Sequence, residues 1–145
     1  MNIVSLLVVF KMQFYLLLLQ RNKKTSTTIM FTISKEFHFS ASHQLRGLAE
    51  DHPCMRLHGH NYVIKVFLRG GLNQDGFVQD YNDLKPITDW VNNVLDHRNL
   101  NDVFDFQTSV ENMSKYIFDK FKPQFPLLYA VEMSETPKTN CRYEE

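Results

Sequence analysis

The sequence is poor in cysteine and carries no excess of charge. Its 145 residues include two cysteines, Cys54 and Cys141, which are too few for a disulfide-stapled secreted scaffold or a four-cysteine zinc site. Sixteen basic and sixteen acidic residues balance, so no overall attraction to nucleic acid or to an anionic membrane is expected. With five glycines, five prolines and 43% hydrophobic residues, collagen-like and disordered classes are excluded. We expect one globular domain whose partners are small molecules or copies of itself.

The first 29 residues differ from the rest. Residues 3–19 form an apolar run interrupted by Lys11 and followed by a basic cluster. A membrane anchor would need a longer, uncharged run, and a secretory signal would carry its basic residues before the apolar part. The third interpretation is that the reading frame is over-extended and Met30 is the natural start, which we favour. We therefore predict an N-terminal extension at residues 1–29 and a working domain at residues 30–145.

Several segments of the working domain alternate apolar and polar residues, as half-buried strands do. The first is Phe31 to His43, in which Phe37 and Phe39 lie on one face. The second is residues 57–68, and Gly70-Gly71 predicts a turn after it. The other predicted strands are a short one at 77–79, one at 127–133 and one at 140–144.

Two segments instead repeat their apolar residues every three to four positions, which predicts amphipathic helices. They are residues 81–95, with Pro86 tolerated in the first turn, and residues 109–121, which Pro123 ends. Strands followed by two helices and then further strands predict an α+β domain with an antiparallel sheet.

Three histidines fit a metal site. Side chains two apart on a strand point to the same side, so His58 and His60 can reach one point in space. His43, at the end of the preceding strand, supplies a third nitrogen and leaves one position of a tetrahedral ion free, as in catalytic zinc sites. The alternative is that these are ordinary core or surface histidines.

Cys54 allows three interpretations: a fourth metal ligand, a small buried hydrophobe or a reactive thiol. Its neighbours His52 and Arg56 lie in a basic loop, which favours the thiolate form. Cys141 has no such neighbours, and we expect it to serve packing.

Two further places carry candidate chemistry. Asp96 precedes His97 just after a predicted helix, and a carboxylate that orients an imidazole suits acid or base catalysis. The alternative is a helix C-cap that complements the helix dipole. Glu135 stands at a strand end, where it is either an ordinary exposed carboxylate or the partner of a planar ligand with two adjacent N–H groups.

Together these segments resemble the 6-pyruvoyl-tetrahydropterin synthase family. The resemblance runs in order from about Phe31 to Tyr143 and rests on four motifs: Phe39-Ser40-Ala41-Ser42-His43, Cys54-Met55-Arg56-Leu57-His58-Gly59-His60-Asn61-Tyr62, Leu95-Asp96-His97-Arg98-Asn99-Leu100-Asn101 and Ser134-Glu135-Thr136. Three residues between the cysteine and the His-Gly-His pair look like the queuosine-pathway branch, the 6-carboxy-5,6,7,8-tetrahydropterin synthases. The pyruvoyl-forming branch has a longer spacer.

The resemblance implies a tunnelling fold, in which each subunit has a four-stranded antiparallel sheet with two helices on one face. Subunits would join their sheets into a barrel, and trimers would stack into a homo-hexamer with active sites at subunit contacts. A cytoplasmic enzyme without nucleic-acid or membrane partners is the corresponding expectation.

The resemblance also implies roles for individual residues. His43, His58 and His60 would hold Zn²⁺, and Cys54 would be the general base. Asp96 and His97 would assist proton transfer. Glu135 would anchor the amino-pyrimidine edge of the pterin, and Ser109 would keep a hydroxyl for it, although Val110 departs from the family pattern.

The implied substrate is 7,8-dihydroneopterin triphosphate, and the products would be 6-carboxytetrahydropterin, acetaldehyde and triphosphate. Zinc would act as a Lewis acid on the substrate's side-chain hydroxyls. No Gly-x-Gly-x-x-Gly segment is present, in agreement with an internal redox rearrangement that needs no nicotinamide. The alternatives are a pyruvoyl-forming triphosphate lyase and a pterin-binding or structural zinc module without turnover.

Overall fold

The computed structural model describes residues 29–145. The predicted extension at residues 1–29 therefore lies, apart from Ile29, outside the described residues, and that division of the chain stays a prediction. Among residues 29–145, no helix combines the length and the apolar character needed to cross a membrane.

Four long strands form the antiparallel sheet, and their bounds follow the alternation of apolar residues. They are β1 (Phe31–His43), β2 (His58–Gly70), β4 (Leu128–Thr136) and β5 (Thr139–Glu144). A two-residue strand, β3 (Arg98–Asn99), adds to the outer edge of β1 in parallel, so the sheet order is β3-β1-β2-β4-β5. The α+β class with four antiparallel strands is confirmed, with β3 as an addition.

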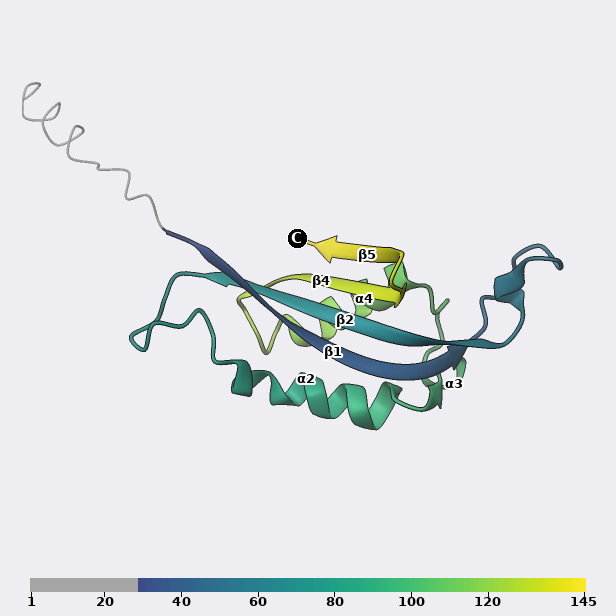
Figure 1. Ribbon diagram of the computed structural model, residues 1–145, viewed down its shortest axis with the longest axis horizontal. Coiled ribbons are helices and arrows are strands. Elements are labelled where there is room, and N and C mark those ends of the chain that lie inside the picture. The colour runs from purple at the N-terminus through teal and green to yellow at the C-terminus, as the bar shows by residue number, and fades with distance from the viewer. Residues whose placement is uncertain (1–28) are drawn as a thin grey trace, which may run out of the picture.

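The helices cover one face of this sheet (Figure 1). Helix α4 (Val110–Phe121) packs on β4 and β5, with Ile117 and Phe118 buried. Ser109 begins this helix, since its side chain accepts a hydrogen bond from the Asn112 N–H at its N-terminus. Along β2 every second residue from Tyr62 to Leu68 is buried, so the core lies between this face and the helices.

The other predicted helix, 81–95, divides into three successive turns of different pitch. A 3₁₀ turn η2 (Tyr81–Leu84) leads into α2 (Lys85–Trp90), which continues as a π-helical turn η3 (Val91–Leu95). The last turn widens because the Asp96 N–H donates to the Val91 carbonyl, five residues back. The chain then forms β3 and a short helix α3 (Leu100–Val103), which periodicity did not predict.

The predicted strand at Phe77–Gln79 is wrong. The Phe77 N–H donates to the side chain of Asn73, and the Asn73 N–H donates to the Phe77 carbonyl. These bonds close a tight turn on the segment itself, so its backbone is unavailable for pairing with a strand.

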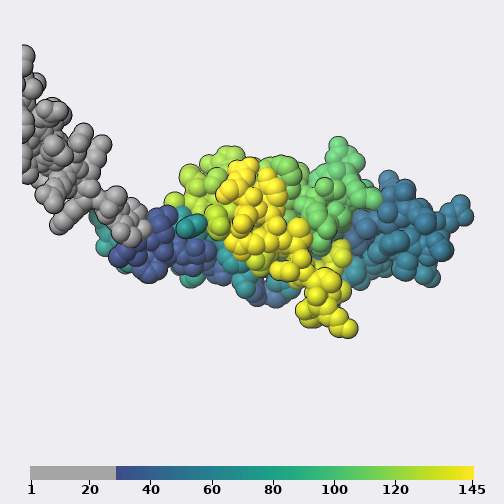
Figure 2. All heavy atoms as spheres, turned by 90° about the horizontal axis from the view of Figure 1, so that it is seen from above, coloured from purple at the N-terminus to yellow at the C-terminus, as the bar shows by residue number. Residues whose placement is uncertain are grey.

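The loop between β1 and β2 contains a 3₁₀ turn, η1 (Pro53–Met55), which carries Cys54. Figures 1 and 2 show that this loop forms one end of the described molecule, opposite to the start of β1. The last residue of β1 and the first of β2 meet at the base of the loop, because His43 pairs with His58. The strand ends and the loop together define the place where the candidate site is built.

Candidate metal centre and active site

Three histidines converge where β1 ends and β2 begins. His43 pairs with His58 in the sheet, and His60 pairs with Ala41, so all three rings stand on the helix-covered face. One ligand nitrogen from each ring lies within 4.8 Å of the other two. Within residues 29–145 this is the one group of three or more His, Cys, Asp or Glu side chains close enough to share an ion.

Backbone carbonyls fix how two of these rings face each other. Nδ1 of His43 lies 3.0 Å from the Thr108 carbonyl, and Nδ1 of His58 lies 2.7 Å from the Arg56 carbonyl. A carbonyl only accepts, so each Nδ1 carries the hydrogen and each Nε2 of the neutral ring presents a lone pair. Those two Nε2 atoms are 3.1 Å apart.

Two lone pairs aimed at each other at that separation repel unless a cation lies between them. Metal-ligating histidines commonly donate their second ring nitrogen to a backbone carbonyl in this way. The donor set therefore fits a divalent metal ion held by three imidazoles, with zinc among the ions that prefer nitrogen ligands.

Burial favours the neutral form, which binds a metal, in the rings of His43 and His60. The His43 side chain is 1% exposed, and burial lowers its pKa below the usual histidine value. Burial likewise lowers the pKa of His60. Neutral imidazoles at these positions present lone pairs without first releasing a proton.

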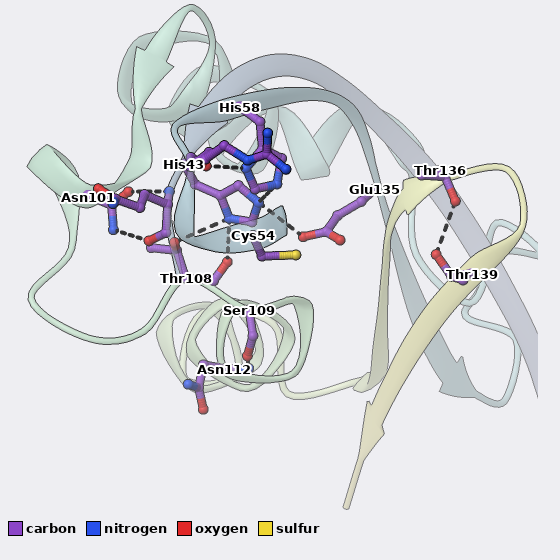
Figure 3. A network of polar contacts seen from close by, with 12 residues as sticks. His43, Cys54, His58, Asn101, Thr108, Ser109, Asn112, Glu135, Thr136 and Thr139 are labelled. Carbon is purple, nitrogen blue, oxygen red and sulfur yellow. Dashed lines mark hydrogen bonds and ion pairs between the residues drawn. The ribbon is translucent and has the colours of Figure 1, made fainter. Parts of the chain in front are cut away.

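Glu135 lies beside the cluster, as Figure 3 shows. Its Oε1 is 3.6 Å from Nε2 of His43, and its side chain is 24% exposed, so one side of the carboxylate faces solvent. The ring of Tyr62 lies next to the rings of His43 and His60, and its hydroxyl is buried without a hydrogen-bond partner among the described residues. Burial, and secondarily the negative charge of Glu135, raises the pKa of Tyr62.

Cys54 lies outside the histidine group but on the same side of it as Glu135 (Figure 3). Its N–H donates to Nδ1 of His52, and its carbonyl accepts from the Leu45 N–H at 2.8 Å. The backbone around the thiol is thus held on both sides, and the sulfur is free of the ligand set.

Asp96 and His97 lie elsewhere, on the outer edge of β1. Oδ1 of Asp96 accepts from the Ser40 N–H at 2.9 Å, and the His97 N–H donates to the Ser40 carbonyl at 2.7 Å. The two side chains also meet, with Oδ2 of Asp96 2.9 Å from Nδ1 of His97. The Ser40 hydrogen bond is the main cause that lowers the pKa of Asp96.

Among residues 29–145, no hydrogen bond or ion pair joins His97 to the histidine cluster. His97 is 82% exposed and adopts a φ of 57°, an unusual conformation for a residue other than glycine. Within residues 29–145, no hydrogen bond or ion pair joins it to Cys54 or Glu135. It lines a cavity of about 500 Å³ together with Gly59, Arg98 and His60, so one residue of the cluster borders this cavity as well.

Comparison with known proteins gives this arrangement a context. A profile of the family described as 6-pyruvoyl tetrahydropterin synthase matches residues 32–145. The chain belongs to the 6-pyruvoyl tetrahydropterin synthase family. The suspected family and its fold are thereby confirmed.

Relatives in this family carry more than one kind of name. The chain is 32% identical over 145 residues to a 6-carboxy-5,6,7,8-tetrahydropterin synthase of Haemophilus influenzae, covering 80% of this chain and 100% of that protein. It is 37% identical over 113 residues to the 6-pyruvoyl tetrahydrobiopterin synthase of Dictyostelium discoideum, covering 68% and 84%. The structure of 6-pyruvoyl tetrahydropterin synthase from Caenorhabditis elegans matches with a TM-score of 0.73 at 33% identity, covering 81% and 97%.

Some features of the candidate site could not be predicted from the sequence. The Ser109 hydroxyl caps α4, and its contact with a pterin stays a prediction. The adjacent Thr108, which was not predicted, anchors His43 through its carbonyl, and a backbone acceptor of this kind leaves no signature in a sequence. Cys141 is half-buried and burial raises its thiol pKa, in keeping with the packing role expected for it.

Proposed function

We propose that the protein converts 7,8-dihydroneopterin triphosphate, with uptake of water, to 6-carboxy-5,6,7,8-tetrahydropterin, acetaldehyde and triphosphate, as a step of queuosine biosynthesis. The observation that carries the proposal is the pair of imidazoles whose Nε2 atoms face each other at 3.1 Å while their Nδ1 atoms are occupied by carbonyls. A bound cation would relieve the repulsion between these two nitrogens, and the third imidazole, His60, lies beside the pair.

His43, His58 and His60 would hold the zinc ion. A bound zinc ion supplies a Lewis acid that withdraws electron density from the substrate's side-chain hydroxyls. Three protein ligands leave room for a substrate, whereas structural zinc sites are closed by four. This difference favours a catalytic site over a structural zinc module.

Cys54 is the proposed general base. As a thiolate near the ligand set but outside it, the residue can take a proton from a substrate carbon while the histidines keep the ion. The three-residue spacing between Cys54 and His58 is the feature that resembles the 6-carboxy branch.

Glu135 is the proposed anchor of the substrate's ring. Its carboxylate lies beside the cluster, partly exposed to solvent, and a carboxylate can accept two parallel hydrogen bonds from the amino-pyrimidine edge of a pterin. Ser109 lies at the start of α4 close by and is proposed to offer its hydroxyl to the same ring.

The Asp96–His97 pair is proposed to act in a neighbouring subunit of a homo-oligomer. Among residues 29–145, no hydrogen bond or ion pair joins the exposed imidazole to another candidate catalytic group, but the carboxylate and the backbone of Ser40 orient it. A second copy that places its Cys54 opposite this imidazole would complete the site. A small domain commonly completes its active site in this manner.

The products decide between this reaction and the pyruvoyl-forming one, which the names of two relatives favour. Zinc-loaded protein is incubated with dihydroneopterin triphosphate, and the carbon fragment is identified by mass spectrometry. Release of acetaldehyde is the expected result. Accumulation of 6-pyruvoyltetrahydropterin with no two-carbon fragment would overturn the proposal.

Replacement of the thiol separates catalysis from binding alone. Cys54→Ala is expected to lower kcat by about 100-fold or more while zinc content stays unchanged, because the sulfur lies outside the ligand set. Cys141→Ser is the matched control and should keep normal turnover. Joint loss of zinc and of the fold in Cys54→Ala would instead indicate a structural zinc module.

A further inference from the structure

After β1 ends at His43, the backbone of the next residues makes its outer-edge hydrogen bonds with side chains instead of with a neighbouring strand. The Gln44 N–H donates to Oδ1 of Asn101 at 2.7 Å, and Nδ2 of Asn101 donates to the Gln44 carbonyl at 2.9 Å. One carboxamide thus satisfies both backbone groups of the residue that follows a proposed metal ligand. A neighbouring strand would make the same pair of bonds.

Gln107 repeats this pattern two residues later. The Arg46 N–H donates to Oε1 of Gln107 at 3.0 Å, and Nε2 of Gln107 donates to the Arg46 carbonyl at 2.8 Å. The backbone carbonyl of Gln107 accepts from Nδ2 of Asn112 in α4, which ties this second carboxamide to the helix.

Leu45, between Gln44 and Arg46, directs its backbone N–H to the opposite edge of the segment. The Leu45 N–H donates to the Cys54 carbonyl at 2.8 Å, and Nε2 of Gln44 donates to the Met55 carbonyl. In extended chain the backbone groups of alternate residues point to opposite edges. The segment 44–46 is therefore held by two carboxamides on one edge and holds the Cys54 turn on the other.

We propose that Asn101 and Gln107 are positioning residues that set the distance between the Cys54 thiol and the histidine cluster. The inference rests on the proposed role of Cys54 as the base. Only the two residues Gln44 and Leu45 separate His43 from the bond to Cys54, so a shift of this segment displaces the thiol relative to the histidines. Asn101 ends the motif Leu95–Asn101, in which Asp96 and His97 are the residues expected to assist proton transfer.

Isosteric substitutions test the two-way hydrogen bonds directly. In Asn101→Asp an oxygen replaces Nδ2 and faces the Gln44 carbonyl, which repels it, while the acceptor for the Gln44 N–H remains. We expect kcat to fall about tenfold or more, because a displacement on the order of 1 Å costs that much, with KM and zinc content within about twofold of normal. The kcat of Asn101→Ala should fall by a similar factor.

Amide hydrogen exchange gives a readout that does not depend on turnover. The Leu45 N–H, bonded to the Cys54 carbonyl, should exchange about tenfold faster in Asn101→Asp, and the rate of Cys54 alkylation by iodoacetamide should change in a Cys141→Ser background. Asn92→Ala, an exposed carboxamide without a side-chain hydrogen bond to any described residue, is the control and should match the parent. If Asn101 variants fail to fold, Gln107→Glu carries the same test.

The outcomes separate this inference from the function on which it rests. Normal turnover in Cys54→Ala would reject Cys54 as the base, whereas faster exchange at Leu45 in Asn101→Asp would still support the positioning of its loop. Unchanged exchange, alkylation and kcat in both Asn101→Asp and Gln107→Glu would overturn the inference. Loss of zinc in parallel with kcat would also overturn it, since that would assign these residues to the metal site itself.

Discussion

Two regions of the molecule use histidine in opposite ways. His43 is 1% exposed and its ring is fixed by the Thr108 carbonyl, whereas His97 is 82% exposed and is oriented by one carboxylate. All three rings of the cluster around His43 come from two paired strands, so one chain supplies the whole proposed ligand set. The Asp96–His97 pair is equally well oriented but has no reacting partner within the described chain. Folding of one chain brings the groups of the first region together, whereas the second region is proposed to act with a neighbouring subunit.

Removal of a ligand should give the largest effect. His60→Ala is expected to lower zinc affinity by about 100-fold or more and to abolish turnover, because two imidazoles cannot replace three. Zinc content after dialysis and competition with a chelator measure this. His38→Ala is the matched control, since that ring is 67% exposed on the opposite face of the sheet. Equal zinc loss in both variants would contradict a site built from the cluster.

Mixed subunits sharpen the difference between the two regions. Cys54→Ala and His97→Ala should each lose about 100-fold or more of kcat. If His97 serves a neighbouring subunit, a joint refolding of equal amounts should restore about one quarter of normal activity, because about one site in four then combines an intact thiol with an intact imidazole.

A second pair of variants controls this experiment. Cys54→Ala mixed with His58→Ala should stay inactive, since the thiol and the metal ligands belong to the same chain. No recovery in the first mixture would place His97 in its own chain's site or outside catalysis altogether.

The backbone conformation of His97 predicts a smaller effect, which is a gain in the free energy of unfolding when glycine replaces this residue. A φ of 57° is unfavourable for a residue with a Cβ, so His97→Gly should have a higher free energy of unfolding than His97→Ala by about 1 kcal/mol. Denaturation by urea measures the difference. Equal stability of the two variants would mean that the His97 backbone is not strained. Backbone strain would then no longer support a functional role for this residue.

The smallest expected effect concerns pH. The Ser40 N–H lowers the pKa of Asp96, so the carboxylate stabilises the fold fully above the unfolded-state pKa, and the contribution disappears as the pH falls through the lowered folded-state value. The free energies of unfolding of the wild type and Asp96→Asn should therefore converge between about pH 6 and pH 3. Asp105→Asn, at an exposed carboxylate without a side-chain hydrogen bond to any described residue, is the control variant.

Strands and helices with a clear period were predictable. The alternation around Phe37 and Phe39 located β1, and the spacing of apolar residues located α4 to within one residue at its start. The strand expected at Phe77–Gln79 failed because the side chain of Asn73 captures its backbone. The spacing of apolar residues does not show where a side chain competes with a neighbouring strand for backbone hydrogen bonds.

The candidate site divides in the same manner. The i and i+2 spacing of His58 and His60 places two rings on one face, and the structure places His43 beside them. The carbonyls that orient the rings, and the carboxamides of Asn101 and Gln107, depend on loops whose course no local pattern encodes. The separation of His97 from the cluster could be seen only once the chain was folded.

X-ray absorption at the zinc edge tests most directly whether three imidazoles hold an ion that the thiol does not touch. Zinc-loaded protein should show a first shell of nitrogen and oxygen atoms at about 2.0–2.1 Å, with imidazole scattering from three rings and one remaining light atom. The spectrum of Cys54→Ala should be the same. A sulfur atom at about 2.3 Å that disappears in Cys54→Ala would contradict the account, because the proposed base would then be a ligand.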